Sequence, residues 1–261
     1  CTLLCHVASY MSRKAAAAVL EPSKGIKGCM KQRILLDLIE SVPGSFKVMI
    51  IDKTSAEVLS VCLRMSELMD HGITLVEEIS SVRQPLPKSP AMYFIAPTKT
   101  SVNLLIEDWK SKDKYQEAHV FFTSSAPDEI IQQIAASNIA RKIKNMKDML
   151  LDFSVPESLS FHFGQLDEMS QLMGPSINAS VLQNAVSKLT SVAHTIGDNP
   201  IIRYQNTSLC RMFAEQAGAS IEKLAQEVIT MKKQEPRTML VIVDRSVDAA
   251  APLIHDRTYE S

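Results

Sequence analysis

Residues 48–55 read VMIIDKTS, and this stretch decides the class of fold. A short β-rich run ends at Asp52, and a helical pattern follows it directly. Thr54 with Glu57 three residues later matches a capping box, which marks a helix start. The apolar residues beyond recur at helical spacing and predict one helix with one buried face: Val58, Leu59, Cys62, Met65 and Met69. A strand that leads straight into such a helix is the repeating unit of a parallel sheet covered by helices.

The same alternation continues along the chain. Further β-rich runs predict strands at 73–76, 92–95, 119–122 and 150–155. We expect helices before the first strand (34–39), after Thr98, after Ser125 and around the basic residues 141–147. Gly72 ends the first long helix, and the prolines between 85 and 90 exclude helix before the third strand. Residues 25–155 are therefore predicted to form a doubly wound α/β domain on a five-stranded parallel sheet.

The two ends of the chain have a different character. Residues 1–24 are predicted to be a loose tail. Residues 156–261 offer two helices, at 177–196 and 220–232, but only one strong strand, at 239–243. One strand cannot bury two helices, so we expect this region to be the first half of an incomplete α/β second domain, truncated at Ser261.

Composition argues against several classes of function. Twenty-eight basic and 29 acidic residues leave a net charge of −1, which gives no overall field to attract nucleic acid or anionic membrane. The five cysteines are scattered without metal-ligand spacing, as in a reducing compartment. The longest apolar runs, such as 15–20, are far shorter than the ~20 residues that a membrane span needs. These features predict a cytoplasmic protein with no metal and no nucleic-acid partner.

A search for chemistry finds no phosphate-binding loop. None of the glycine-rich phosphate motifs, neither GxGxxG nor GxxxxGK[ST], occurs in the chain. Asp52 and Asp244 each end a strand, where an aspartate either holds magnesium or, more commonly, caps the next element. His119 fits a hydrogen-bonded core position better than a catalytic base. The residues favour a binding protein without a cofactor; the alternative is a magnesium- or nucleotide-dependent Rossmann-like enzyme or receiver domain.

Several longer segments carry a family resemblance. They are DHGITLVEEI at 70–79, RQPLP at 83–87, AMYFIAPT at 91–98, AHVFFT at 118–123, and DRSVD from 244 with PLIH from 252. In this order and spacing they resemble the SM family, the Sec/Munc syntaxin-binding proteins, over residues 34–259. The resemblance implies part of a longer, arch-shaped, non-catalytic protein that clasps a syntaxin-type SNARE and promotes assembly of the SNARE complex. It also implies a role in vesicle docking and exocytosis, with recruitment to the plasma membrane only through the SNARE.

The resemblance implies two binding regions as well. On the concave side of the first domain, the positions that match polar contacts to syntaxin are Asp52, Arg64, Glu77 and Arg83. On its outer face, the positions that match a pocket for a syntaxin N-terminal peptide are Ile131, Met146 and Asp148. The chain departs from the family where Glu57 replaces an arginine, and where Ile131 replaces an aromatic residue that would bury more area. Ser81 and Gln84 also stand where charged residues are usual.

Overall fold

A computed structural model describes residues 25–110, 114–164, 171, 178–228, 231 and 238–244. The chain forms two compact units with a boundary between Phe161 and His162. The predicted tail at 1–24 and the segment 245–261 lie outside the described residues. Each unit is taken by itself below.

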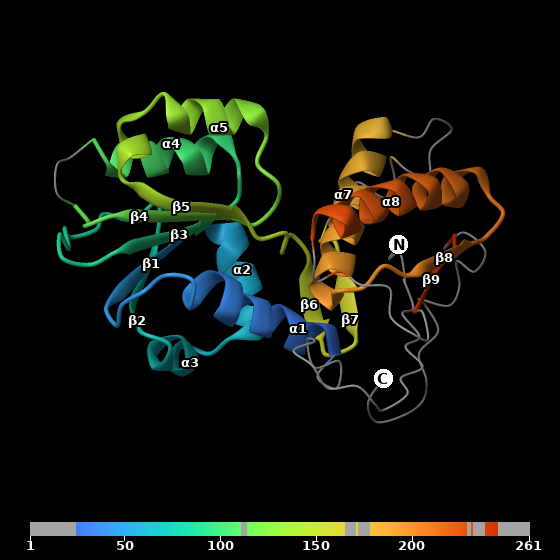
Figure 1. The fold of residues 1–261 in the computed structure, drawn as a ribbon, viewed down its shortest axis with the longest axis horizontal. Helices are drawn as coiled ribbons and strands as arrows, with labels where there is room; N and C mark the ends of the chain where they lie inside the picture. Colours follow the sequence, from blue (N-terminus) through green and yellow to red (C-terminus); the bar gives the residue numbers. More distant parts are fainter. Residues whose placement is uncertain are drawn as a thin grey trace. The chain divides into compact units, whose positions relative to one another are not determined.

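The first unit is built on a five-stranded parallel sheet in the order β2-β1-β3-β4-β5 (Figure 1). Its strands are β1 (Lys47–Ile51), β2 (Ile73–Glu78), β3 (Ala91–Ile95), β4 (Ala118–Phe122) and β5 (Ile143–Asp148). Every residue of β3 and β4 is buried, which explains their continuous apolar sequences. The predicted doubly wound five-stranded parallel sheet is confirmed.

Helices cover both faces of this sheet (Figure 1). One layer holds α4 (Lys99–Asp108) and α5 (Asp128–Ala135), and a 3₁₀ turn at Asn138–Arg141 follows α5. The other layer holds α1 (Gly25–Arg33), the π-helical turn Ile34–Ile39 and α2 (Lys53–Cys62). The short helix α3 (Met65–Asp70) contacts the edge strand β2. The core between the sheet and α4 and α5 includes Tyr93, Val120, Phe122, Leu105 and Ile134.

The predicted fifth strand was misplaced. Residues 141–147, expected as a basic helix, turn at Arg141 and then form β5, which pairs with β4. Residues 150–155 are not the fifth strand, although Leu151, Phe153 and Val155 are buried. Arg33 donates through Nη2 to the carbonyl of Met149 and so holds the chain that leaves β5. An edge strand tolerates charged residues because one side of it faces water.

The helix predicted from Thr54 through Met69 is two helices. Asp52, not Thr54, caps α2, in a capping box with Ser55. The backbone is extended at Leu63 and Arg64, and α3 starts afresh at Met65. Met65 and Met69, expected in the core, are 55% and 59% exposed. Gly72 ends α3 with a φ of 84°, a conformation that favours glycine.

The second unit packs two helices on two parallel strands. The helices are α7 (Ala179–Ile196) and α8 (Ser208–Glu227), and the strands are β8 (Ile201–Tyr204) and β9 (Met239–Ile242). The first predicted helix and the strand at 239–243 are confirmed. The second helix begins at Ser208 rather than 220, because Thr207 accepts a hydrogen bond from the Cys210 N–H and caps it. The sequence analysis missed β8. Two short strands, β6 (Ser154–Glu157) and β7 (Ser160–His162), form a separate two-stranded sheet.

Candidate partner-binding surface

Asp52 lies where ligands bind in many open α/β sheets. The strand order places β1 beside β3, and the connections run outward from this pair in opposite directions, which defines the switch point of the fold. The Asp52 side chain is directed inward, and the residue is only 8% exposed. One carboxylate oxygen accepts hydrogen bonds from the Ser55 N–H (2.9 Å) and hydroxyl (2.9 Å). The other accepts from the Ala96 N–H (2.7 Å) and the Ser101 hydroxyl (2.8 Å).

These bonds use the donors that a bound phosphate would need. Backbone N–H groups and hydroxyls at the starts of the helices after β1 and β3 are the usual cradle for an anion. Here they already hold a carboxylate of the chain itself. Among the described residues, no group of three or more His, Cys, Asp or Glu side chains is placed to hold a metal ion. His119 is buried, and its Nε2 lies 3.2 Å from the Glu117 carboxylate.

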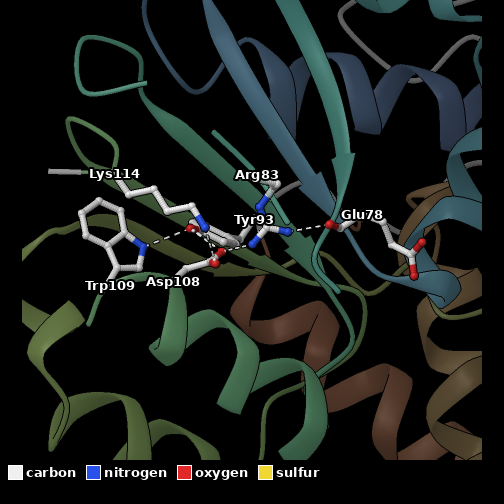
Figure 2. Close-up of polar contacts among 6 residues, drawn as sticks. All are labelled: Glu78, Arg83, Tyr93, Asp108, Trp109 and Lys114. Carbon is white, nitrogen blue, oxygen red and sulfur yellow. Dashed lines mark hydrogen bonds and ion pairs between the residues drawn. The ribbon is translucent and has the colours of Figure 1, made fainter. Parts of the chain in front are cut away.

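Arg83 belongs to a second buried network (Figure 2). Its guanidinium forms an ion pair with Asp108, and it also donates to the carbonyl of Glu78. Lys114 contacts the other Asp108 oxygen at 2.8 Å. The Tyr93 hydroxyl donates to Asp108 (3.2 Å) and accepts from the Trp109 indole N–H (3.0 Å). Burial is the main cause that raises the pKa of Tyr93, and the Asp108 charge adds to it.

This network fixes the loop after β2 to the end of α4. The Arg83 side chain is 1% exposed, so its charge faces Asp108 and not the solvent. The sequence analysis missed Asp108 and Lys114. A signal was available for Asp108, since a carboxylate at the C-terminal end of a helix is unfavourable unless a cation compensates it.

Arg64 differs from these two residues because it is exposed, whereas the Oε2 atom of Glu77 is buried without a hydrogen-bond partner. Arg64 is exposed at the start of α3, and Glu77 is half-buried on the edge strand β2. Exposed apolar side chains accompany them on and beside the same two elements. We call the exposed and partly exposed residues of this edge of the unit the α3–β2 surface: Phe46, Arg64, Met65, Met69, Leu75 and Glu77.

The β1–β2 register pairs Leu75 with Val48 and Glu77 with Ile50, so these two side chains lie on the face of β2 that α4 and α5 cover. The helix α3 is instead joined to α1 by the Glu67–Lys31 ion pair. Phe46 is 71% exposed and precedes Lys47, whose N–H donates to the carbonyl of Gly72 at the end of α3.

The residues of the predicted peptide pocket gather at the opposite edge of the sheet. In the β4–β5 register, Met146 pairs with Val120 and Asp148 pairs with Phe122. Val120 and Phe122 belong to the core cluster on which Ile131 of α5 packs. We call these three residues, Ile131, Met146 and Asp148, the α5–β5 edge.

The Asp148 carboxylate is partly withdrawn from water. It accepts hydrogen bonds from the Ser125 hydroxyl (3.2 Å) and the Ala126 N–H (3.3 Å). Burial raises the pKa of Asp148, and these two bonds oppose the rise. A raised pKa means that the folded state stabilises the protonated, neutral form of this carboxyl group over its charged form.

The fold is that of a doubly wound α/β sheet domain with two edge strands, β2 and β5. The model of the Sec1 family matches residues 47–261, and the chain therefore belongs to the Sec1 family.

Relatives and solved structures agree with this assignment. The Dictyostelium discoideum protein transport protein sec1 is 35% identical over 242 residues, which are 88% of this chain and 40% of the relative. Protein sly1 of Schizosaccharomyces pombe is 32% identical over 227 residues, which are 83% of this chain and 35% of the relative. The chain thus spans about 40% of the length of the curated relatives it matches.

Two solved structures are similar over 90% of the chain. The Unc18–syntaxin 1 complex from Monosiga brevicollis matches with a TM-score of 0.82 and 28% identity, covering 43% of that chain. Sly1p in complex with an N-terminal peptide of Sed5p matches with a TM-score of 0.77 and 27% identity, covering 44%.

The hydrogen bonds of the Asp52 carboxylate lead to a stability prediction. Asp52→Ala removes the α2 cap and leaves the Ala96 N–H and the Ser101 hydroxyl buried without their acceptor. We expect the free energy of unfolding of the first unit to fall by about 3 kcal/mol. Urea unfolding followed by the fluorescence of Trp109, the only tryptophan, measures it. Exposed Glu57→Ala is the control and should change it by less than about 0.5 kcal/mol. Equal effects of the two variants would mean that the hydrogen bonds of Asp52 do not stabilise the first unit.

The buried ion pair between Arg83 and Asp108 leads to a second stability prediction. Arg83→Ala removes one of the two cations that contact the buried Asp108 carboxylate and leaves it with Lys114 and the Tyr93 hydroxyl. We expect a loss of about 3–5 kcal/mol in the same unfolding experiment. Arg141→Ala removes an exposed arginine of the same unit and should cost less than about 0.5 kcal/mol. If Arg83→Ala were as mild as its control, Arg83 would not be a structural residue.

Proposed function

We propose that the chain is the syntaxin-binding part of a non-catalytic regulator of vesicle docking and fusion. The observation that carries this proposal is the α3–β2 surface, where the exposed Met65 and Met69 lie on the short helix that begins at exposed Arg64. Apolar centres with charged neighbours are the usual composition of protein interfaces. A similar structure was solved as a complex with syntaxin 1, which supports a syntaxin-type SNARE as the partner.

The four predicted contact residues take two different roles in this proposal. Arg64 contacts the partner because it is exposed, and Glu77 does so through the part of its side chain that is not buried. Asp52 and Arg83 are positioning residues: one holds the starts of α2 and α4, and the other holds the loop after β2. Charged contacts such as Arg64 guide orientation and the rate of association more than they add affinity.

A non-catalytic role is favoured over the enzyme or receiver alternative. The crevice at the switch point, where such a protein would bind nucleotide or magnesium, is filled by the Asp52 carboxylate. The donors of that crevice would have to release Asp52 before they could bind a phosphate. Membership of the Sec1 family adds independent support.

We further propose that the protein acts on the cytoplasmic side of the plasma membrane in exocytosis and reaches the membrane only through its SNARE. The Dictyostelium relative, a protein transport protein at 35% identity, supports a role in transport. In the described part of the chain, no helix has the length and apolar character to cross a bilayer. Binding through the SNARE also requires no basic membrane patch, in keeping with the net charge of −1.

Charge changes at the α3–β2 surface test the main proposal. We expect Arg64→Glu to weaken binding of a syntaxin cytoplasmic domain about tenfold at low salt, and Glu77→Gln to weaken it several-fold, because each removes a charged contact. Calorimetric titration of the 261-residue chain measures both. Lys99→Glu makes the same charge change on α4 and should bind as the unmodified chain does. An equal loss with Lys99→Glu would mean that net charge, not this surface, sets the affinity.

The α5–β5 edge supports a second contact, with the N-terminal peptide of the same SNARE. The similar Sly1p structure contains an N-terminal peptide of Sed5p, which motivates this assignment. Asp148 fits a binding role, because it lies on the edge strand β5 beside Met146 and burial raises its pKa, so its charge does not stabilise the fold. Ile131 supplies apolar area but less than an aromatic side chain would.

Two substitutions at this edge should act in opposite directions. Ile131→Phe should tighten peptide binding about fivefold, equivalent to ~1 kcal/mol, through added apolar area. Asp148→Asn should weaken it. The same Asp148→Asn change should stabilise the fold at pH 7, because a raised carboxyl pKa means that stability is lost as pH rises through that range. Peptide titration and thermal unfolding measure the two effects. Loss of both stability and binding in Asp148→Asn would indicate a structural residue instead.

A further inference from the structure

The described methionines of the first unit differ in exposure, and Met146 of β5, at 41%, lies between the extremes. Four are completely or almost completely buried: Met30, Met49, Met92 and Met149. In contrast, Met65 and Met69 are more than half exposed and lie one helical turn apart on α3. Side chains four residues apart on a helix are neighbours, so these two exposed methionines lie on one face of α3.

The fold holds α3 in place without using these methionines. Leu68 is the buried residue of the helix. Glu67 accepts a hydrogen bond from the Arg64 N–H (2.9 Å) and forms an ion pair with Lys31 of α1. His71, just past the helix, lies 3.3 Å from Glu40. Since these contacts fix α3, a chemical change at Met65 or Met69 alters the surface and leaves the fold intact.

We propose that Met65 and Met69 are an oxidation site that regulates partner binding, an inference that rests on the proposed function of the α3–β2 surface. The oxidant is a peroxide. The sulfur lone pair attacks one peroxide oxygen, the O–O bond breaks and an S=O bond forms. A proton moves to the departing oxygen, so that one hydrogen peroxide and one thioether give one sulfoxide and one water. Sulfur is oxidised by two electrons and the peroxide is reduced.

The sulfoxide acts through desolvation. A thioether packs well against apolar groups of a partner, whereas an S=O dipole keeps its water or loses a hydrogen bond on burial. Two such groups in the middle of one contact oppose association. Methionine sulfoxide reductases restore the thioether, which makes the change reversible.

The test compares binding before and after treatment with hydrogen peroxide. The probe is a syntaxin cytoplasmic domain that lacks its N-terminal peptide, so that Met146 at the α5–β5 edge does not contribute. We expect peptide mass mapping to find sulfoxide at Met65 and Met69 and not at the four buried methionines. Affinity should fall at least about tenfold and return after treatment with both classes of reductase.

Matched variants assign the effect to these two residues. Met65→Leu/Met69→Leu cannot form sulfoxide, so the ratio of its affinities before and after peroxide should stay near one, whatever its starting affinity. Met146→Leu should still lose affinity on oxidation. An unchanged affinity of the oxidised chain, or an equal loss in the double leucine variant, would overturn the inference alone. A lack of binding by the untreated chain would overturn the proposed function and this inference together.

Discussion

The Asp52 carboxylate is the constraint on which the first unit depends. It joins the start of α2, through Ser55, to the chain after β3 and the start of α4, through Ala96 and Ser101. These two segments leave neighbouring strands at the switch point, where an open sheet otherwise keeps a crevice for a ligand. Because the carboxylate occupies the hydrogen-bond donors at that point, they are not free to bind an external anion.

Buried elements were easier to predict from the sequence than elements at the edges of the sheet. The strands β1, β3 and β4 are covered on both faces, so their apolar runs were recognisable. The edge strand β5 reads IKNMKD, and only its pairing with β4 makes it a strand. The break between α2 and α3 was hidden for a related reason. The helical spacing continues through Met65 and Met69, while the extended backbone at Leu63 and Arg64 leaves no mark in the apolar pattern.

The roles of the predicted binding residues were also hard to predict, because they depend on contacts between residues far apart in the sequence. Arg83, in a polar loop with prolines, has the local sequence of a surface charge. Its burial depends on Asp108, 25 residues away, and nothing in the local pattern encodes that pairing. Asp52 could be recognised as a possible cap, but its bond to Ser101 spans 49 residues. Long-range polar pairs thus decide which of these charges are structural, and of the four predicted contact residues they leave Arg64 as the exposed one.

The positions of the two exposed edges constrain how one partner could use both. The α3–β2 surface lies at one end of the strand order and the α5–β5 edge at the other, so four strand spacings, or about 19 Å, separate the two edge strands. The strands between them are buried and closely packed, and such a core does not deform gradually. A partner that binds at both edges must therefore bridge the sheet with its own chain. A folded helical region at one edge and an extended N-terminal peptide at the other meet this requirement, because a flexible connection spans the distance and each contact raises the effective concentration for the other.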